Sequence, residues 1–208
     1  DYFIRSKPTL LISFARSGDS PESLATVKLA EAHCDHLYQL IITCNKNGEL
    51  ALNSRNDHTY VFTLPEETND RSLAMTSSFS SMLLAGLLIL DLDAIENRSP
   101  IIEKICECGK FILRENLLNL RSIAAIDFKR AVFLGSGSLF GVAHESHLKV
   151  QELSDGKVIC KYDSFLGFRH GPRAVVDNST LITYLLSNNG HSRRYELDLI
   201  KSIDESPT

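Results

Sequence analysis

Leu10-Leu-Ile-Ser-Phe14 is followed in the chain by Ala15-Arg-Ser-Gly-Asp-Ser20 and then by Pro21-Glu-Ser23. The short apolar run predicts a buried β-strand. Proline in a first helical turn, with Ser20 at the N-cap position, predicts that a helix begins at Pro21. This strand, turn and helix are the repeating unit of a parallel sheet covered by helices, so they decide the fold class.

The turn between this strand and this helix has the chemistry of a phosphate site. It directs free backbone N–H groups, the hydroxyls of Ser17 and Ser20 and the positive end of the helix dipole toward one point. Gly18 lets the backbone approach an anion closely, and Arg16 adds positive charge unless it only faces solvent. An ordinary strand-to-helix turn with a well-capped helix explains the same residues, and both interpretations stay open.

Short apolar runs alternate with helical patterns along the chain. We predict strands at residues 10–14, 39–43, 60–63, 131–134, 158–162 and 181–185, and helices at 21–34, 71–90, 101–120, 139–153 and 194–203. This alternation predicts an α/β fold with parallel sheets flanked by helices in three α-β-α layers. The pattern of the first strand and turn recurs loosely as Val132-Phe-Leu-Gly-Ser-Gly137, so we expect two related units. The best boundary is the segment 96–100.

The predicted helix 139–153 carries three charged side chains on one side. Glu145, Lys149 and Glu152 follow one another at spacings of four and three residues. A neighbouring apolar stripe is expected to hold the helix on a core; it consists of Leu139, Val142, Ala143, Val150 and Leu153. Two acids and a base beside a buried face, followed by His170 in a glycine-flanked turn, suit proton-transfer chemistry. The alternative is an exposed helix with ordinary ion pairs.

Composition excludes several classes of function. The net charge of −4 and the absence of a basic run argue against nucleic-acid binding, so an anionic ligand needs a local site. The longest apolar stretch, Met82–Leu90, is too short to span a bilayer. The five cysteines form no CxxC pair, which indicates reduced thiols in a cytoplasmic protein. No second pair of cysteines accompanies Cys106-Glu-Cys108 to complete a set of metal ligands, so we predict no metal site.

Three separated motifs, in this order, closely resemble the sugar isomerase (SIS) domain proteins. They are Ser17-Gly-Asp-Ser-Pro-Glu-Ser23, the segment Thr68–Phe79, and Glu145…Lys149…Glu152 followed by Gly167-Phe-Arg-His-Gly-Pro172. Within the family, the pattern is similar to the branch of tagatose-6-phosphate ketose/aldose isomerases and galactosamine-6-phosphate deaminase/isomerases. It is less similar to the isomerase half of glucosamine-6-phosphate synthase. The resemblance extends over nearly the whole chain.

The resemblance implies a truncated chain of two SIS domains. Residues 1–96 then form the C-terminal part of the first domain, and residues 97–208 form a connecting helix and the N-terminal part of the second. It also implies a cytoplasmic homo-oligomer that isomerises or deaminates a hexose or hexosamine 6-phosphate, with neither nucleic acid nor membrane as a partner. The helix 71–90, apolar nearly all round its C-terminal half, is expected to lie in a domain or subunit interface.

The resemblance further assigns roles to residues. Glu152 moves a proton between C1 and C2, with Lys149 orienting it or stabilising oxyanion charge and Glu145 in support. His170 opens the sugar ring and can come from a neighbouring subunit. The phosphate is anchored by Ser17, Gly18 and Ser20, with Arg16 adding charge. Because Ala15 stands where the synthase-type loop has a serine, Thr76 or Ser77 is expected to complete the phosphate shell, unless these hydroxyls only cap their helix.

Such a reaction needs no metal or organic cofactor, because acid–base groups alone activate a carbon acid beside a carbonyl. The main alternative is a non-catalytic SIS module that senses a phosphosugar and regulates a partner. A further alternative is a fragment that folds and dimerises but has lost activity.

Overall fold

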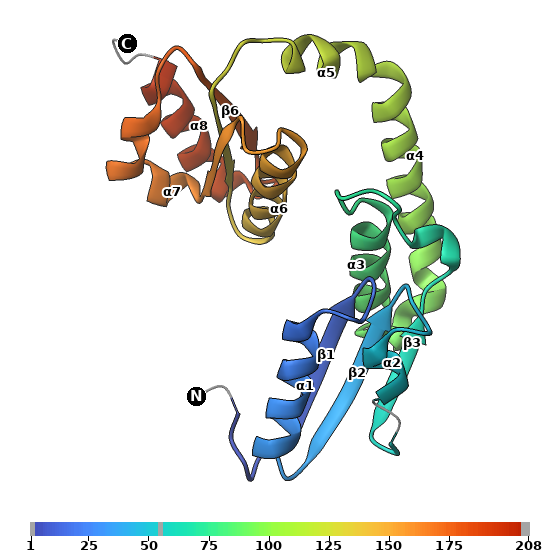
Figure 1. Ribbon diagram of the computed structural model, residues 1–208. Helices are drawn as coiled ribbons and strands as arrows, with labels where there is room; N and C mark the ends of the chain where they lie inside the picture. The colour runs from blue at the N-terminus through green and yellow to red at the C-terminus, as the bar shows by residue number, and fades with distance from the viewer. Residues whose placement is uncertain (1–2, 54–55, 205–208) are drawn as a thin grey trace. The chain divides into compact units, whose positions relative to one another are not determined.

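The computed structural model describes residues 3–53 and 56–204. The chain divides into two compact units, Asp1–Glu107 and Cys108–Thr208 (Figure 1). The division falls inside helix α4 (Ser99–Glu115), downstream of the boundary that the sequence suggests. The assignment of residues 1–96 and 97–208 to parts of two SIS domains stays a prediction.

Unit 1 is built on a parallel sheet of three strands in the order β1-β2-β3. The strands are β1 (Thr9–Ala15), β2 (Leu37–Thr43) and β3 (Thr59–Thr63). Because side chains alternate along a strand, each face of the sheet has its own core. Helices α1 (Pro21–His33) and α2 (Glu49–Asn53) cover the face of Ala15 and Ile41, and α3 (Ser77–Ile89) covers the face of Ile42. Two 3-10 helices, η1 (Glu66–Thr68) and η2 (Leu92–Arg98), flank α3.

Unit 2 repeats this layered arrangement with the strand order β5-β4-β6, all parallel. The strands are β4 (Arg130–Gly135), β5 (Ile159–Asp163) and β6 (Thr180–Leu185). Helix α6 (Ser138–Leu153) packs on the face of Ala131 and Phe133. Helices α7 (Phe165–Phe168) and α8 (Gly190–Asp204) pack on the face of Val132 and Leu134, near the 3-10 helix η3 (Gly171–Val175).

The α/β class, the parallel pairing and all six predicted strands are confirmed. Three helix predictions were wrong in their bounds. The helix predicted at 71–90 begins only at Ser77, and the one predicted at 101–120 is broken at Asn116 into α4 and α5 (Leu117–Ala124). Helix α8 begins at Gly190 rather than at Arg194, because the Asn189 side chain accepts hydrogen bonds from the N–H groups of His191 and Ser192. The short helices α2 and α7 were not predicted.

Two burial predictions also need correction. Strand β1, predicted as buried, is an edge strand whose Leu10 and Phe14 are exposed. On α6, Ala143 and Val150 reach the core, whereas Val142 and Leu153 of the predicted stripe are exposed. The stripe is narrower than expected because α6 has a sheet on one side only.

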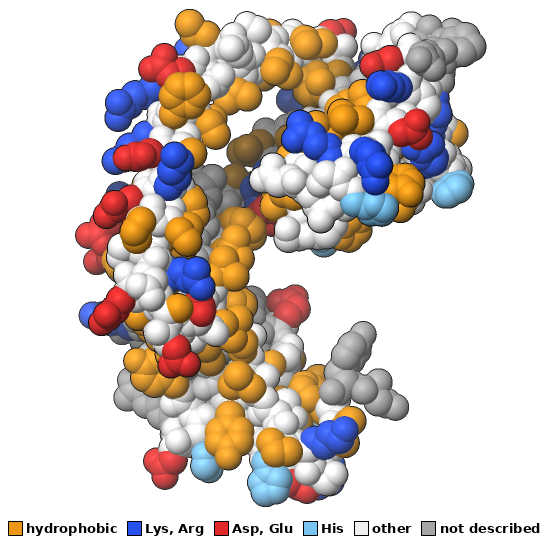
Figure 2. All heavy atoms as spheres, turned by 180° about the vertical axis from the view of Figure 1, so that it is seen from behind, with side chains coloured by type: hydrophobic (Ala, Val, Ile, Leu, Met, Phe, Trp, Pro, Cys, Tyr) orange, Lys and Arg blue, Asp and Glu red, His pale blue; other side chains and the backbone are white. Residues whose placement is uncertain are grey.

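Many hydrophobic side chains of the helices are exposed (Figure 2). On α3, Met82, Ala85 and Gly86 are buried against the sheet, while Leu83 and Leu87 face outward. In the part of the chain that the structure describes, no single helix is long and apolar enough to cross a membrane. Helix α3 and the segment from Leu92 to Glu115 meet that criterion only together, as a pair bent by 119°.

Candidate active site

The predicted phosphate turn lies at the carboxyl edge of the unit 1 sheet, between β1 and α1. Gly18 has a φ of +73°, a conformation that favours glycine. Ser20 occupies the N-cap position, but its hydroxyl donates to the Ser23 Oγ at 2.7 Å rather than capping a backbone amide. Among the described residues, the N–H groups of Gly18, Ser20 and Glu22 have no acceptor, so they remain free to donate to an anion. Ser20 and Glu22 are exposed, whereas Gly18 is buried.

The next loop of the same edge, residues 44–49, packs against this turn and hydrogen-bonds to it. The Asn45 Nδ2 donates to the Ser17 carbonyl oxygen at 2.9 Å, and the Leu50 N–H donates to the Gly18 carbonyl oxygen at 2.8 Å. The Gly48 backbone lies so close that a β-carbon there would come within 2.1 Å of the Ser17 oxygen. The carbonyl groups of Ser17 and Gly18 are thus held by the protein. Of the N–H groups in the turn, that of Asp19 donates to the Ser17 Oγ at 3.3 Å, whereas those of Gly18 and Ser20 stay available.

A polar pocket of about 370 Å³ adjoins this loop at the ends of β2 and β3. It is lined by side chains from two loops, including Asn45, Lys46, Asn47, Glu66 and Asn69. This pocket borders the loop that holds the predicted phosphate turn, whose Asp19 and Ser20 are exposed while Gly18 is buried.

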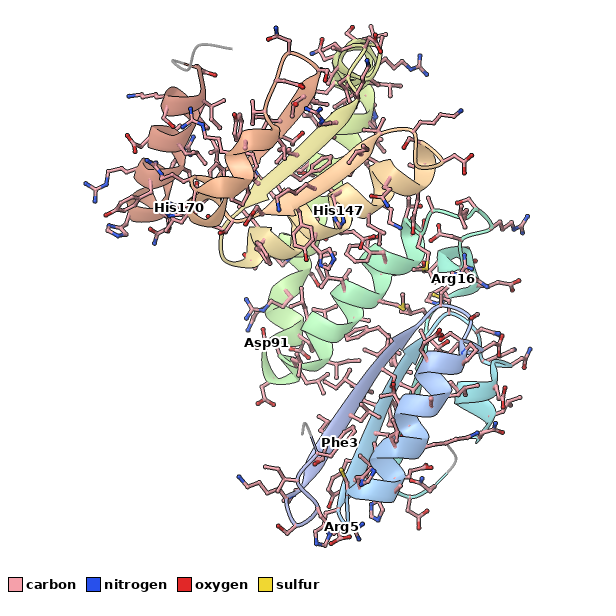
Figure 3. All side chains as sticks on the ribbon, turned by 60° about the vertical axis from the view of Figure 1, so that its left-hand side comes forward. Phe3, Arg5, Arg16, Asp91, His147 and His170 are labelled. Carbon is pink, nitrogen blue, oxygen red and sulfur yellow. The ribbon has the colours of Figure 1, made fainter. Side chains whose placement is uncertain are left out.

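Arg16 has a role that the sequence did not suggest. Its Nη1 donates to the carbonyl oxygens of Asp70 and Ser72, both at 3.2 Å, so it neither faces only solvent nor points freely at a ligand (Figure 3). The Thr76 hydroxyl donates to the Asp70 carboxylate at 3.0 Å, whereas the Ser77 hydroxyl has no partner among the described residues. Of the two hydroxyls expected to complete the phosphate shell, Ser77 is the available one.

The three charged residues of α6 meet as the spacing predicts. The Lys149 Nζ lies 2.6 Å from the Glu152 Oε2 and 3.5 Å from the Glu145 Oε1. The Lys149 side chain is 19% exposed, and those of Glu145 and Glu152 are 26% and 32% exposed. Burial lowers the Lys149 pKa, but the hydrogen bond to Glu152 and the two negative charges outweigh it and raise the pKa above its ordinary value. Lys149 is thus a fixed cation between two partly shielded carboxylates.

His170 does not join this cluster within unit 2. Helix α6 starts just after β4 ends, so its last turn, with Glu152, lies at the amino edge of the sheet. His170 follows β5 and α7 and therefore lies at the carboxyl edge. The 16 residues of α6 span about 24 Å between these edges. His170 is exposed, and its ring makes no hydrogen bond with the described residues.

The chain is similar to known proteins over nearly its whole length. A D-galactosamine-6-phosphate deaminase, AgaS, from Shewanella sp. (strain ANA-3) is 45% identical over 197 residues, which are 94% of this chain and 50% of that protein. The AgaS deaminase of Escherichia coli O157:H7 is 41% identical, over 98% of this chain and 53% of its own length. No family model matches the chain.

A solved structure gives the same result. The tagatose-6-phosphate ketose/aldose isomerase of Escherichia coli superposes with a TM-score of 0.89 at 40% identity, over 98% of this chain and 56% of that one. In sequence and in structure, the chain is thus similar to a galactosamine-6-phosphate deaminase and to a tagatose-6-phosphate ketose/aldose isomerase. It spans about half the length of the curated relatives that it matches.

The sequence patterns did not predict two parts of the candidate site. One is Asp70, whose carboxylate accepts five hydrogen bonds from Thr76, Ser77 and Ser78. The other is the loop of Asn45 and Gly48. An acidic residue shortly before a Thr-Ser-Ser helix start, and an Asn-x-Asn-Gly turn directly after a strand, were the available signals.

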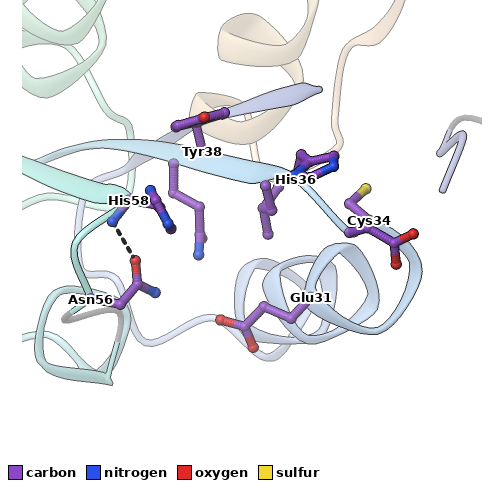
Figure 4. Close-up of a pocket in the computed structure, with 9 residues that line it drawn as sticks. Glu31, Cys34, His36, Tyr38, Asn56 and His58 are labelled. Atoms are coloured by element: carbon purple, nitrogen blue, oxygen red, sulfur yellow. Dashed lines mark hydrogen bonds between the residues drawn. The ribbon is translucent and has the colours of Figure 1, made fainter. Parts of the chain in front are cut away.

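A second polar pocket of unit 1 lies away from the predicted phosphate turn. It has a volume of about 270 Å³ and is lined by side chains that include Glu31, Cys34, His36, Tyr38 and His58 (Figure 4). These residues surround the starts of β2 and β3, so the pocket lies at the amino edge of the sheet. It contains none of the predicted site residues.

Proposed function

We propose that the protein interconverts the aldose and ketose forms of a hexose or hexosamine 6-phosphate, as an isomerase or as a deaminase/isomerase. The observation that carries this proposal is the Lys149–Glu152 pair of 2.6 Å on α6. The ion pair fixes the position of the Glu152 carboxylate, which is partly shielded from water, and a positioned carboxylate can take up and return a proton. The names of the relatives support the substrate class, with galactosamine 6-phosphate and tagatose 6-phosphate as the first candidates.

The substrate's phosphate binds at the N-terminus of α1. Its oxygens accept hydrogen bonds from the open N–H groups of Gly18 and Ser20 and from the serine hydroxyls of the turn. This anchor lies far from the reacting carbons, so its binding energy can orient C1 and C2 for the proton transfer.

In this proposal Glu152 removes the C2 proton of the open-chain aldose, which leaves an enediol, or an enolamine when C2 carries an amine. Returning the proton to C1, while the O1–O2 proton shift is completed, gives the ketose. From the enolamine, protonation at C1 gives a C2 imine instead. Addition of one water to this imine releases ammonia and leaves the same ketose, which makes the deaminase reaction hydrolytic. Lys149 stabilises the negative charge that develops on oxygen.

The protein acts as a homo-oligomer in the cytoplasm. Because Glu152 and His170 lie at opposite edges of the unit 2 sheet, the ring-opening histidine comes from a neighbouring subunit. Exposed Leu83 and Leu87 on α3 supply apolar surface for such an interface. All five cysteines are free thiols, which supports a reducing compartment.

The test is a panel of hexose and hexosamine 6-phosphates, incubated with the protein at its full natural length while ammonia and ketose are measured. We expect a galactosamine or galactose-type 6-phosphate to give ketose. Ammonia in equal amount identifies a deaminase, and ketose without ammonia identifies an isomerase. Binding of these sugars without turnover would instead support the phosphosugar sensor. No binding of any phosphosugar would contradict both.

A further inference from the structure

Two helix N-termini flank the end of β1, one on each face of the unit 1 sheet. Helix α1 packs on the face of Ala15, and α3 packs on the face of Ile12 and Ile42. Helix α3 approaches β1 closely, since a β-carbon on Gly86 would come within 2.9 Å of the Phe14 ring. Both N-termini point to the carboxyl edge, where an anionic ligand binds in a parallel α/β sheet.

The two N-termini differ in what occupies them. The open amides of α1 have no acceptor, whereas the Asp70 carboxylate already fills the N-terminus of α3. Its Oδ2 accepts from the Ser78 Oγ at 2.7 Å and from the N–H groups of Thr76 and Ser78, both at 2.9 Å. Its Oδ1 accepts from the Thr76 hydroxyl and the Ser77 N–H. These bonds, the two from Ser78 first, hold the Asp70 pKa far below its ordinary range.

The backbone of the same segment is tied to the predicted phosphate turn. The carbonyl oxygens of Asp70 and Ser72 both accept from the Arg16 guanidinium, and Arg16 directly precedes Ser17. The Asp70 side chain fixes the segment to α3, and its backbone fixes Arg16. One residue therefore links the start of α3 to the start of the turn.

We propose that Asp70 is a positioning residue for the phosphate turn. It closes the α3 N-terminus with its own carboxylate and, through Arg16, holds the turn in the shape that binds the phosphate at α1. The inference rests on the proposed function and adds a residue to it.

The experiment measures the dissociation constant of inorganic phosphate for the full-length protein and for Asp70→Asn. The amide keeps the size of the side chain but presents N–H groups to donors, so the cap is lost. Positioning predicts binding about tenfold weaker, because a displaced turn loses its aligned donors. Loss of charge repulsion alone would make phosphate bind more tightly, and loss of a merely structural cap would leave the constant unchanged. Either of those two results overturns the proposal.

Asp177 in unit 2 provides a matched control. Its carboxylate accepts hydrogen bonds from the Ser179 N–H and hydroxyl and from the Thr180 hydroxyl, and it pairs with Arg130. Its pKa is also far below the ordinary range, first because of the bonds from Ser179. Asp177→Asn should therefore remove a comparable network and leave phosphate binding unchanged. An equal weakening in Asp177→Asn would mean that general destabilisation, not positioning, explains the result.

A double-mutant cycle with Arg16→Gln tests the route of the effect. If Asp70 acts through Arg16, the Asp70→Asn change should weaken phosphate binding by less than about twofold in the Arg16→Gln background. Additive effects would overturn the link.

If Asp70→Asn does not fold, Ser78→Ala removes one donor to the same carboxylate and should weaken binding in the same direction. A wild-type protein that binds no phosphate would instead contradict the proposed function itself.

Discussion

The two units present their candidate groups in different ways. Unit 1 offers backbone N–H groups of one turn. The position of this turn is fixed by contacts with Asn45, Gly48 and Leu50. Unit 2 offers three charged side chains on one helix, with Lys149 between Glu145 and Glu152. The first arrangement depends on the shape of the backbone and the second on the balance of charge. They should therefore fail under different mutations and at different pH values.

The largest effect is expected where shape alone is changed, in Gly48→Ala. The added carbon would lie within 2.1 Å of the Ser17 carbonyl oxygen, a backbone atom that cannot rotate away. The turn must shift, and we expect inorganic phosphate to bind about 100-fold more weakly. Isothermal titration calorimetry measures this change.

Gly141→Ala in α6 is the matched control, since nothing lies within 4 Å of the added carbon there. Alanine in that helix should stabilise the fold by up to about 1 kcal/mol and leave the phosphate constant unchanged. Equal binding by the wild-type protein and Gly48→Ala would mean that the turn of Ser17 does not hold the phosphate.

A change of charge in unit 2 should affect turnover rather than binding. Lys149→Met keeps the length of the side chain but leaves the carboxylates of Glu145 and Glu152 without their common cation. Nothing then offsets the repulsion between the two carboxylates or fixes the position of Glu152, and no cation remains for developing oxyanion charge. We expect kcat to fall about tenfold to 100-fold with little change in the phosphate constant. An unchanged kcat in steady-state assays would contradict a role for Lys149.

The same lysine predicts a pH dependence of stability. Its folded-state pKa is raised, so its contribution to stability is complete below the ordinary lysine value of about 10.4 and is lost as pH rises through the folded value. The thermal midpoint of the wild-type protein should therefore fall more steeply above about pH 10 than that of Lys149→Met. Parallel curves for the two proteins would show that the ion pairs contribute nothing to stability.

The smallest effect is expected for Ser20→Ala. The Ser20 hydroxyl bonds to the Ser23 Oγ and caps no backbone amide, so its loss should cost less than the roughly 1 kcal/mol of an ordinary N-cap. One lost neutral hydrogen bond to phosphate corresponds to about threefold to tenfold weaker binding. Chemical denaturation and phosphate titration measure the two quantities, and a loss as large as that of Gly48→Ala would reverse the assignment of backbone and side-chain roles.

The sequence predicted the parts of the fold that depend on local patterns. All six strands are short apolar runs, and α1 and α6 have clear starts, so these elements were found. The start of α3 was missed because Asp70 reaches forward to three N–H groups that a continued helix would have used internally. The break at Asn116 was missed because Asn116 keeps its backbone hydrogen bonds to Ile112 and from Leu120 and makes no side-chain cap. The low helix propensity of asparagine is a weak signal within an amphipathic pattern.

The candidate site was also predictable where it depends on a local pattern, and not where it depends on contacts between distant segments. The spacing of Glu145, Lys149 and Glu152 implies contact within one helix, and the structure has that contact. The bonds from Arg16 to residues 70 and 72 join segments that lie far apart in the chain, and no spacing rule reports such a contact. The separation of His170 from Glu152 follows only from the direction of α6 on the sheet.

The central claim is that Glu152 carries the proton between C1 and C2, and isotope exchange tests it most directly. The exchange of the substrate's C2 proton with solvent deuterium is followed by NMR in Glu152→Gln and in Glu145→Gln, each at full length. Glutamine keeps the shape but lacks the basic carboxylate, so exchange should fall by a factor of about 100 or more in Glu152→Gln. It should persist in Glu145→Gln, and both variants should still bind phosphosugar. Exchange that persists in Glu152→Gln and disappears in Glu145→Gln would contradict the account and assign the base to Glu145.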